Sequence, residues 1–179
     1  DFKNIIWDFD GVIKDSVVVK SDAFIQLFLQ FGDEVAKKVR KHHEENGGMS
    51  RYDKLPIYLD WAGEEPTVHL VEEYAEKFTR IVKQQVVDSP WVEGVLEYLQ
   101  KYYQYKKFFL VTATPQLEIE DILSQLKIAK YFKQVVGSPT YKIEAVKVLL
   151  NRYNINPRHA VVIGDSNSDY EAAKANHIT

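Results

Sequence analysis

Hydrophobic residues follow two alternating patterns along this chain. Four short runs are rich in β-branched and aromatic residues, and longer stretches with apolar residues at helical spacing separate them. The runs are residues 4–9, 108–112, 134–136 and 160–164. Strands that alternate with amphipathic helices are typical of a parallel α/β sheet. The pattern therefore predicts an α/β fold built on four core strands.

A long segment without a convincing strand separates the first two runs. It contains about a hundred residues, which is far more than a crossover between parallel strands requires. We therefore predict an all-helical domain at residues 15–88, inserted after the first strand. The core would then consist of residues 1–14 and 89–179.

The helices of this insertion can be read from the spacing of its apolar residues. One helix is predicted to begin after Asp15-Ser16, which can cap it, and to end at Gly32. Another is predicted to open at Pro66. Between them, residues 46–54 read as a polar, flexible and cationic loop, suited to contact with an anion. The pair His42-His43 is expected at a solvent-exposed helix end rather than in a metal site.

Composition excludes several classes of protein. With 179 residues, 45% of them hydrophobic, the chain can bury an ordinary core. It has no cysteine, which excludes disulfides, thiol nucleophiles and thiolate-bound metals. A formal net charge of −3 argues against a nucleic-acid partner. No apolar stretch approaches the length of a membrane span and no leader is visible, so we expect a cytoplasmic protein without a membrane partner.

Two acids at the end of the first run provide the strongest chemical signal. Asp8 and Asp10 stand two residues apart, so they should face the same side, and Gly11 allows a sharp turn beyond them. Two adjacent carboxylates repel each other unless a cation or a shared proton compensates. This segment therefore predicts either a divalent metal or an acid that stays protonated.

The ends of the later strands carry groups suited to a phosphate. Thr112 ends the second strand, and Thr114 can cap a helix that has Pro115 in its first turn. Such a helix start offers free N–H groups to a phosphate oxygen. Lys142 is predicted at the start of a helix, where the positive end of the helix dipole disfavours a cation. A lysine at this position would be well placed if an anion and several carboxylates lay nearby.

Two further acids follow the fourth strand. Asp165 lies in the loop after this strand, and Asp169 lies in the first turn of the next helix. Ligands of open α/β folds bind at the carboxyl edge of the sheet, where all these groups should converge. Hard oxygen ligands suit Mg²⁺, which would offset the repulsion among the acids. We therefore predict a Mg²⁺ and phosphate site at this edge.

The ordered set of motifs resembles the haloacid dehalogenase superfamily. It consists of Asp8-Phe9-Asp10-Gly11-Val12, Thr112, Lys142 and Gly164-Asp165-Ser166-Asn167-Ser168-Asp169. The insertion resembles the helical cap of the β-phosphoglucomutase and phosphoglycolate phosphatase branch, and the core would be Rossmann-like. The segment Gly48-Met49-Ser50-Arg51 is similar to the cap loop of that branch, where the Arg meets an anionic group of the substrate. The resemblance implies a hydrolase.

The resemblance also implies a role for each site residue. Asp8 would attack phosphorus to form an aspartyl-phosphate, and Asp10 would act as general acid and then general base. Thr112 and Lys142 would stabilise the phosphoryl group. The implied metal ligands are Asp8, Asp10 (through its main-chain carbonyl), Asp165 and Asp169. The implied substrate-binding residues are Gly11, Arg51, Ala113 and Ser166.

Several departures from the family pattern bear on the activity. Lys142 lacks the Gly-Lys-Pro context, and Lys20 stands where β-phosphoglucomutase has a hinge-region His. A Mg²⁺-dependent phosphatase is therefore the first choice, with a phosphosugar mutase second and a phospho-receiver or an inactive relative as remote alternatives. The substrate would be a small sugar or hydroxy-acid phosphate, and a monomer is the default. Because a strand usually follows the helix near Asp169 and no Met begins the chain, we expect trimmed ends.

Overall fold

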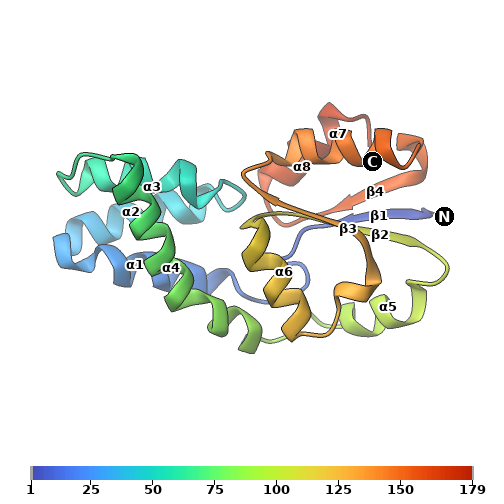
Figure 1. The fold of residues 1–179 in the computed structure, drawn as a ribbon, viewed down its shortest axis with the longest axis horizontal. Helices are drawn as coiled ribbons and strands as arrows, with labels where there is room; N and C mark the ends of the chain where they lie inside the picture. The colour runs from blue at the N-terminus through green and yellow to red at the C-terminus, as the bar shows by residue number, and fades with distance from the viewer. Residues whose placement is uncertain (1, 179) are drawn as a thin grey trace.

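The computed structural model describes residues 2–178, and within them four parallel strands form one sheet in the order β3-β2-β1-β4 (Figure 1). The strands are β1 (Asn4–Trp7), β2 (Lys107–Pro115), β3 (Phe132–Ser138) and β4 (Ala160–Ile163). Each coincides with one of the four predicted runs, although β2 and β3 are longer than predicted. Residues 1 and 179, the outer ends of the predicted core, lie outside the described residues.

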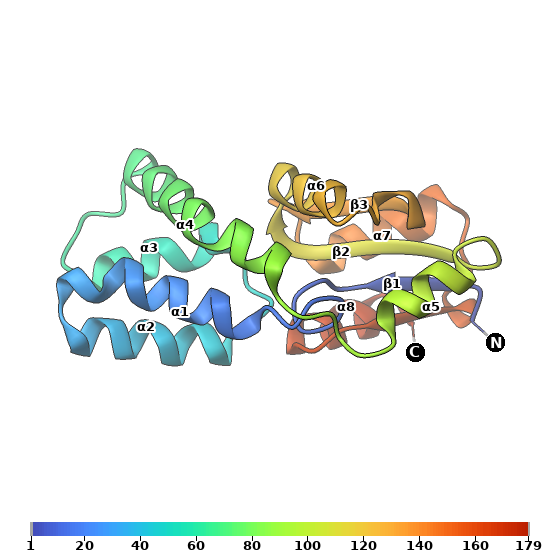
Figure 2. The same cartoon turned by 90° about the horizontal axis from the view of Figure 1, so that it is seen from below.

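Helices cover both faces of the sheet (Figures 1 and 2). On one face lie α5 (Val95–Tyr102) and α6 (Gln116–Gln125), and on the other lie α7 (Lys142–Arg152) and α8 (Asn167–Ala175). Side chains alternate along β1, so Ile5 and Trp7 pack in the first layer while Ile6 packs in the second. A sheet buried on both faces explains why its strands read as continuous apolar runs.

The register of the strands brings their carboxyl ends together. Trp7, the last residue of β1, pairs with Leu110 of β2 and Ile163 of β4. The N–H of Asp8 continues this ladder with a hydrogen bond of 2.9 Å to the carbonyl oxygen of Ile163. Beyond Val111, the pairing of β2 with β3 becomes irregular. The segments that follow β1, β2 and β4 therefore leave the sheet at one edge.

A bundle of helices is inserted between β1 and β2 and lies next to this edge (Figures 1 and 2). Its helices are α1 (Val17–Phe28), α2 (Asp33–Glu45), α3 (Arg51–Trp61) and α4 (Val68–Asp88). Short 3₁₀ turns occur at Leu29–Phe31, Ala129–Tyr131 and Pro157–His159. The bundle is held together by buried aromatic residues, and the rings of Phe24 and Phe78 lie 4.1 Å apart between centroids.

The chain crosses between the insertion and the core twice, and the two crossings lie side by side. The N–H of Asp15 donates to the carbonyl oxygen of Pro90, and Lys14 Nζ donates to the carbonyl oxygen of Val87. Lys14 also forms an antiparallel bridge with Trp91. These contacts join the entry and the exit of the insertion.

Helix boundaries in the insertion correct two predictions. Residues 46–54 do not form one loop, because α3 begins at Arg51, where the Ser50 side chain accepts the N–H of Tyr52. The helix predicted to open at Pro66 begins at Val68, because Thr67 is its N-cap. Capping hydroxyls, rather than the limits of the apolar stripe, set both starts.

The paired histidines of α2 differ from the exposed helix end that was predicted. His43 is buried, and its Nδ1 lies 2.9 Å from Lys54 Nζ of α3. His42 Nδ1 lies 3.1 Å from the hydroxyl of Tyr58. The prediction was wrong for this helix end because α3 packs against it. No helix within residues 2–178 is both long and apolar enough to cross a membrane.

Candidate active site

A cavity of about 240 Å³ lies at the carboxyl edge of the sheet and reaches into the insertion. Most of the site residues predicted from the sequence line this cavity: Asp8, Asp10, Arg51, Thr112, Ala113, Lys142, Asp165 and Ser166. Asp169 is not among the residues that line this cavity, but it contacts Lys142, which is one of them. Gly11 is not in the cavity wall and lies against Asp165. Segments that are distant in sequence thus meet at one place.

Lys142 connects two of the acids. Its Nζ atom lies 2.6 Å from Asp8 Oδ2 and 2.7 Å from Asp169 Oδ1, and all three side chains are buried. Burial works to lower the pKa of Lys142, but the two carboxylates outweigh burial and raise it. Lys142 at the start of α7 therefore stays charged. The two carboxylates are the nearby anions that were predicted to compensate for its unfavourable position at a helix start.

Three carboxylates are crowded around this lysine. Oxygen atoms of Asp8, Asp165 and Asp169 lie within 4.8 Å of one another. Three carboxylates and one ammonium leave a formal charge of −2. Burial raises the pKa of Asp8 to about 7, with Lys142 opposing and Asp169 adding to the effect. Burial and Asp169 likewise raise the pKa of Asp165. A divalent cation would offset this excess charge, so the cluster fits a metal with oxygen ligands.

Two of these acids owe their positions to local contacts. Gly11 has a φ of 74°, and a Cβ atom there would lie only 2.1 Å from Asp165 Oδ2. The turn after Asp10 can therefore approach Asp165 only with a glycine at this position. Asp169 accepts hydrogen bonds from the N–H and the hydroxyl of Ser166 on its Oδ2, while its Oδ1 faces Lys142. Both oxygens of Asp169 are thus engaged.

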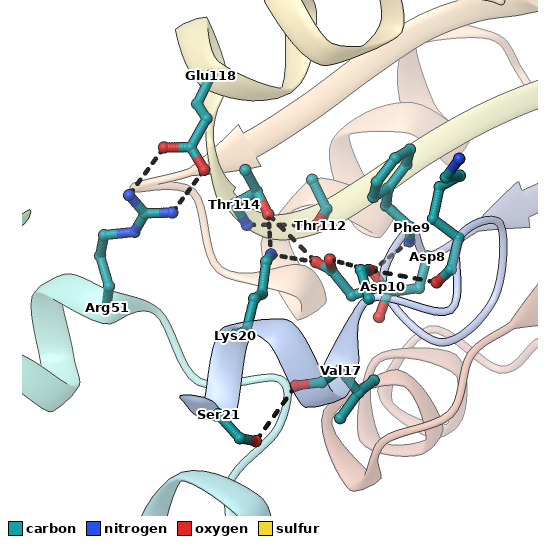
Figure 3. A network of polar contacts seen from close by, with 12 residues as sticks. Asp8, Phe9, Asp10, Val17, Lys20, Ser21, Arg51, Thr112, Thr114 and Glu118 are labelled. Atoms are coloured by element: carbon teal, nitrogen blue, oxygen red, sulfur yellow. Dashed lines mark hydrogen bonds and ion pairs between the residues drawn. The ribbon is translucent and has the colours of Figure 1, made fainter. Parts of the chain in front are cut away.

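Asp10 has a separate set of partners, which Figure 3 shows in part. Ser16 Oγ donates to Asp10 Oδ1 at 2.6 Å, and Lys20 forms an ion pair with Oδ2. Thr114 Oγ1 accepts from Lys20 Nζ at 2.8 Å and donates to Asp10 Oδ2 at 3.3 Å. Burial works to raise the pKa of Asp10, but Lys20 outweighs it and the pKa is lowered. Asp10 therefore favours its ionised form in this arrangement.

These contacts replace two predicted helix caps. The Ser16 side chain makes no capping hydrogen bond to α1, and its hydroxyl serves Asp10 instead. Thr114 does not cap a helix either, because β2 continues to Pro115 and α6 begins at Gln116. Sequence reasoning missed Lys20 as a site residue. It could have been found, because Ser16 and Lys20 are four residues apart at the start of a helix and so share one face.

Thr112 lies in the last part of β2, where the pairing with β3 is irregular. Its side chain is buried, and its Oγ1 accepts the N–H of Thr114 at 3.2 Å. Ala113, between them, lines the cavity. The backbone of this segment thus faces the same space as Asp8.

Arg51 links the insertion to the core. Its guanidinium donates to both carboxylate oxygens of Glu118 at 2.8 and 2.7 Å (Figure 3). It also donates to Thr79 Oγ1 at 2.6 Å. Burial works to raise the pKa of Glu118, but Arg51 outweighs it and the pKa is lowered. Sequence reasoning missed Glu118, which lies on α6 and has no local signal that marks it as a partner. Arg51 lines the cavity, but its fork of donors is directed at Glu118.

A second contact brings the insertion close to the core. A Cβ atom on Gly48 would lie 1.7 Å from Ser168 Oγ and 2.7 Å from Ser166 Oγ. The loop before α3 therefore touches Ser166, which follows β4, and Ser168 in the first turn of α8. The insertion thus contacts the core at the carboxyl edge through this loop as well as through Arg51.

Comparison with known proteins identifies the family of this chain. The family profile of the haloacid dehalogenase-like hydrolases matches residues 5–179. The chain belongs to this family. A phosphorylated carbohydrates phosphatase of Thermotoga maritima is 27% identical over 177 residues, which covers 96% of this chain and 80% of that protein. A phosphoglycolate phosphatase of Pseudomonas savastanoi pv. phaseolicola is 26% identical over 183 residues, covering 97% of this chain and 66% of that protein.

Solved structures of the haloacid dehalogenase-like hydrolases confirm the fold. A family protein from Streptococcus pneumoniae superposes with a TM-score of 0.72 at 17% identity, covering 99% of this chain and 82% of that one. A Geobacter sulfurreducens hydrolase of the superfamily gives a TM-score of 0.66 at 19% identity, covering 99% and 84%. The predicted α/β fold with a Rossmann-like sheet is therefore confirmed. The chain spans just under two thirds, 66%, of its Pseudomonas savastanoi relative.

Proposed function

We propose that this chain is a Mg²⁺-dependent phosphatase that hydrolyses a small phosphate monoester through a phosphoryl group held covalently on Asp8. The convergence of Asp8, Lys142 and two further acids around one cavity carries this proposal. The names of the relatives support the same class, since they are phosphatases of phosphorylated carbohydrates and of phosphoglycolate. The substrate would be a sugar phosphate or a hydroxy-acid phosphate.

Asp8 is the nucleophile in this proposal. One of its oxygens accepts the N–H of Phe9 at 2.7 Å and the other faces Lys142, so the carboxylate is fixed at the cavity wall. A carboxylate that attacks phosphorus forms an acyl phosphate, which water then hydrolyses. Lys142 stabilises the charge that collects on the phosphoryl oxygens. Thr112 and the N–H of Ala113 supply hydrogen-bond donors to the same oxygens, whereas both donors of Ser166 are engaged by Asp169 and support the loop.

Asp10 moves the protons. It would protonate the leaving alcohol and then accept a proton from the attacking water. The ion pair with Lys20 favours the ionised carboxylate, which suits the second of these steps. An arriving phosphoryl group brings negative charge close to Asp10, which raises its pKa toward the form needed for the first step.

The acid cluster would hold Mg²⁺. Asp8, Asp165 and Asp169, together with the main-chain carbonyl of Asp10, would be its ligands. When bound, the metal offsets the negative charge that otherwise repels a phosphate ester from Asp8. Asp165 is the exposed member of the cluster, and Lys142 and Ser166 already engage Asp169. We therefore assign Asp165 the direct contact and Asp169 a direct or water-mediated one.

Phosphate release from a panel of phosphorylated metabolites, with Mg²⁺ and with chelator, tests this function. Asp8→Asn should lower turnover on the order of 10³-fold or more, because removal of a nucleophile abolishes the covalent route. Asp15→Asn is the matched control, since Asp15 is a nearby exposed acid, and it should retain wild-type turnover. Equal turnover by Asp8→Asn would refute the mechanism. An isomerised sugar phosphate that forms only with a bisphosphate activator would indicate a mutase instead.

A further inference from the structure

One cation of the cavity has no role in the proposed chemistry. Lys54 lies on α3, one turn after Arg51, and lines the cavity although only 1% of its surface is exposed. Its Nζ atom lies 2.9 Å from Nδ1 of His43. Burial and the nearby Lys54 lower the pKa of His43 to about 3, so its imidazole is neutral and accepts a hydrogen from the lysine. A lysine ammonium has three N–H donors, and the hydrogen bond to His43 uses one of them.

The other cations of the cavity all face a carboxylate. Lys142 is paired with Asp8 and Asp169, and Lys20 is paired with Asp10. The guanidinium of Arg51 is held by Glu118. Within residues 2–178, by contrast, no carboxylate oxygen lies within 4.0 Å of Lys54 Nζ. Buried charges in proteins are paired as a rule, so an unpaired lysine at a cavity wall indicates an anion that arrives with a ligand.

We propose that Lys54, oriented by His43, binds a second anionic group of the substrate, a carboxylate or a second phosphate. The inference deepens the proposed function and rests on it. The phosphoryl group would lie at the sheet edge beside Asp8, and Lys54 approaches the same cavity from the insertion. The substrate would therefore carry one negative group at the sheet edge and another at the insertion wall.

The surroundings of Lys54 favour this use. Phe24 and Phe78 are buried apolar side chains of the same cavity wall, and a charge pair among such groups is stronger than in water. Burial lowers the pKa of Lys54 to about 7, with Lys20 adding to this effect and Asp10 opposing it. An incoming anion would raise that pKa again, so binding would restore a full positive charge. Arg51 is not free for this task while Glu118 holds it.

Two matched pairs of esters test the inference. The first pair is 2-phosphoglycolate and 2-hydroxyethyl phosphate, and the second is 1,3-propanediol bisphosphate and 3-hydroxypropyl phosphate. Each pair compares a second anionic group with a hydroxyl group, and the two pairs separate a carboxylate from a phosphate. The quantity measured is the ratio of kcat/KM for the acidic ester to that for its neutral partner. Wild-type protein should favour at least one acidic ester.

Lys54→Gln should lower this ratio roughly 10- to 100-fold, which is the range for the loss of one hydrogen bond to a charged group. Glutamine retains an N–H donor for His43, so a purely structural role of Lys54 would leave the ratio unchanged. Lys41→Gln is the control, because Lys41 lies on α2 with 78% of its side chain exposed. It should not alter the ratio.

Two results would overturn the inference while the phosphatase function stands. One is an unchanged ratio in Lys54→Gln, and the other is wild-type turnover that favours neither acidic ester. If Lys54→Gln does not fold, the same ratio measured on Lys54→Met decides the matter, because methionine is of similar length and carries no charge. Absence of phosphate release from every ester of the wider panel would refute both proposals.

Discussion

Replacement of Lys54 by methionine should make the protein more stable. The pKa of Lys54 falls from its ordinary 10.5 to about 7, because the charged form is buried. At about 1.36 kcal/mol for each pH unit, this difference corresponds to an upper limit of about 5 kcal/mol of lost stability. The methionine leaves Nδ1 of His43 buried without its donor, at a cost of about 1 to 3 kcal/mol. We therefore expect Lys54→Met to gain free energy of unfolding, by at most about 2 to 4 kcal/mol.

The gain should depend on pH in a defined direction. Below about pH 7 the lysine is protonated in both the folded and the unfolded state, so the wild type carries the full cost of burial. Between about pH 7 and 10.5 only the unfolded chain holds the proton, so the stability of the wild type rises with pH. The advantage of Lys54→Met should therefore be largest below pH 7 and shrink steadily above it.

Urea unfolding of both proteins at about pH 6 and about pH 9 measures this difference. Lys41→Met serves as the control, because that lysine is exposed, and it should change stability by no more than about 0.5 kcal/mol at either pH. Two results would contradict this reasoning. One is that Lys54→Met is less stable than the wild type at the lower pH, and the other is that its gain in stability does not shrink at the higher pH. Either result would show that the ammonium group of Lys54 has a countercharge or is not buried. Gain of stability combined with loss of selectivity is what a binding residue should show.

Two further substitutions test the geometry of the site. Glu118→Gln leaves the buried guanidinium of Arg51 without its countercharge and should lower the free energy of unfolding by about 3 to 5 kcal/mol in urea titrations; no change would show that the pair is not formed in solution. Gly11→Ala places a Cβ atom 2.1 Å from Asp165 Oδ2 and should abolish phosphate release. It should also abolish the rise in Tm that Mg²⁺ is expected to cause in the wild type by binding the folded protein. Gly63→Ala is its control, since Gly63 has a similar φ of 80° but no neighbour within 4 Å, and retention of activity by Gly11→Ala would refute the argument.

The sheet and its acidic edge could be predicted from sequence because their signals are local. The apolar runs specify the strands, and parallel pairing then forces the strand ends to meet, as the register of Trp7 with Leu110 and Ile163 shows. Asp8 and Asp165 follow two of these ends directly. Lys142 could be predicted as well, because a cation at a helix start needs a nearby anion.

The contacts between insertion and core could not be predicted in the same way. Arg51 lies 67 residues from Glu118, and no periodicity says which face of α6 meets α3. The burial of His43 likewise depends on how α3 packs against α2. Each of these contacts depends on the relative placement of whole helices, which local sequence does not encode.

The adjacency of the two crossings has a consequence for how such a protein can diversify. Lys14 and Trp91 form a bridge where the chain enters and leaves the insertion, so both covalent connections between the helical bundle and the core lie at one place. A different bundle could be grafted between these two points without any change to the strand ladder or the acids beside it. Under the proposed role of Lys54, natural variation could therefore exchange the helices that select the substrate as one unit and retain Asp8, Lys142 and Asp165 at the sheet edge.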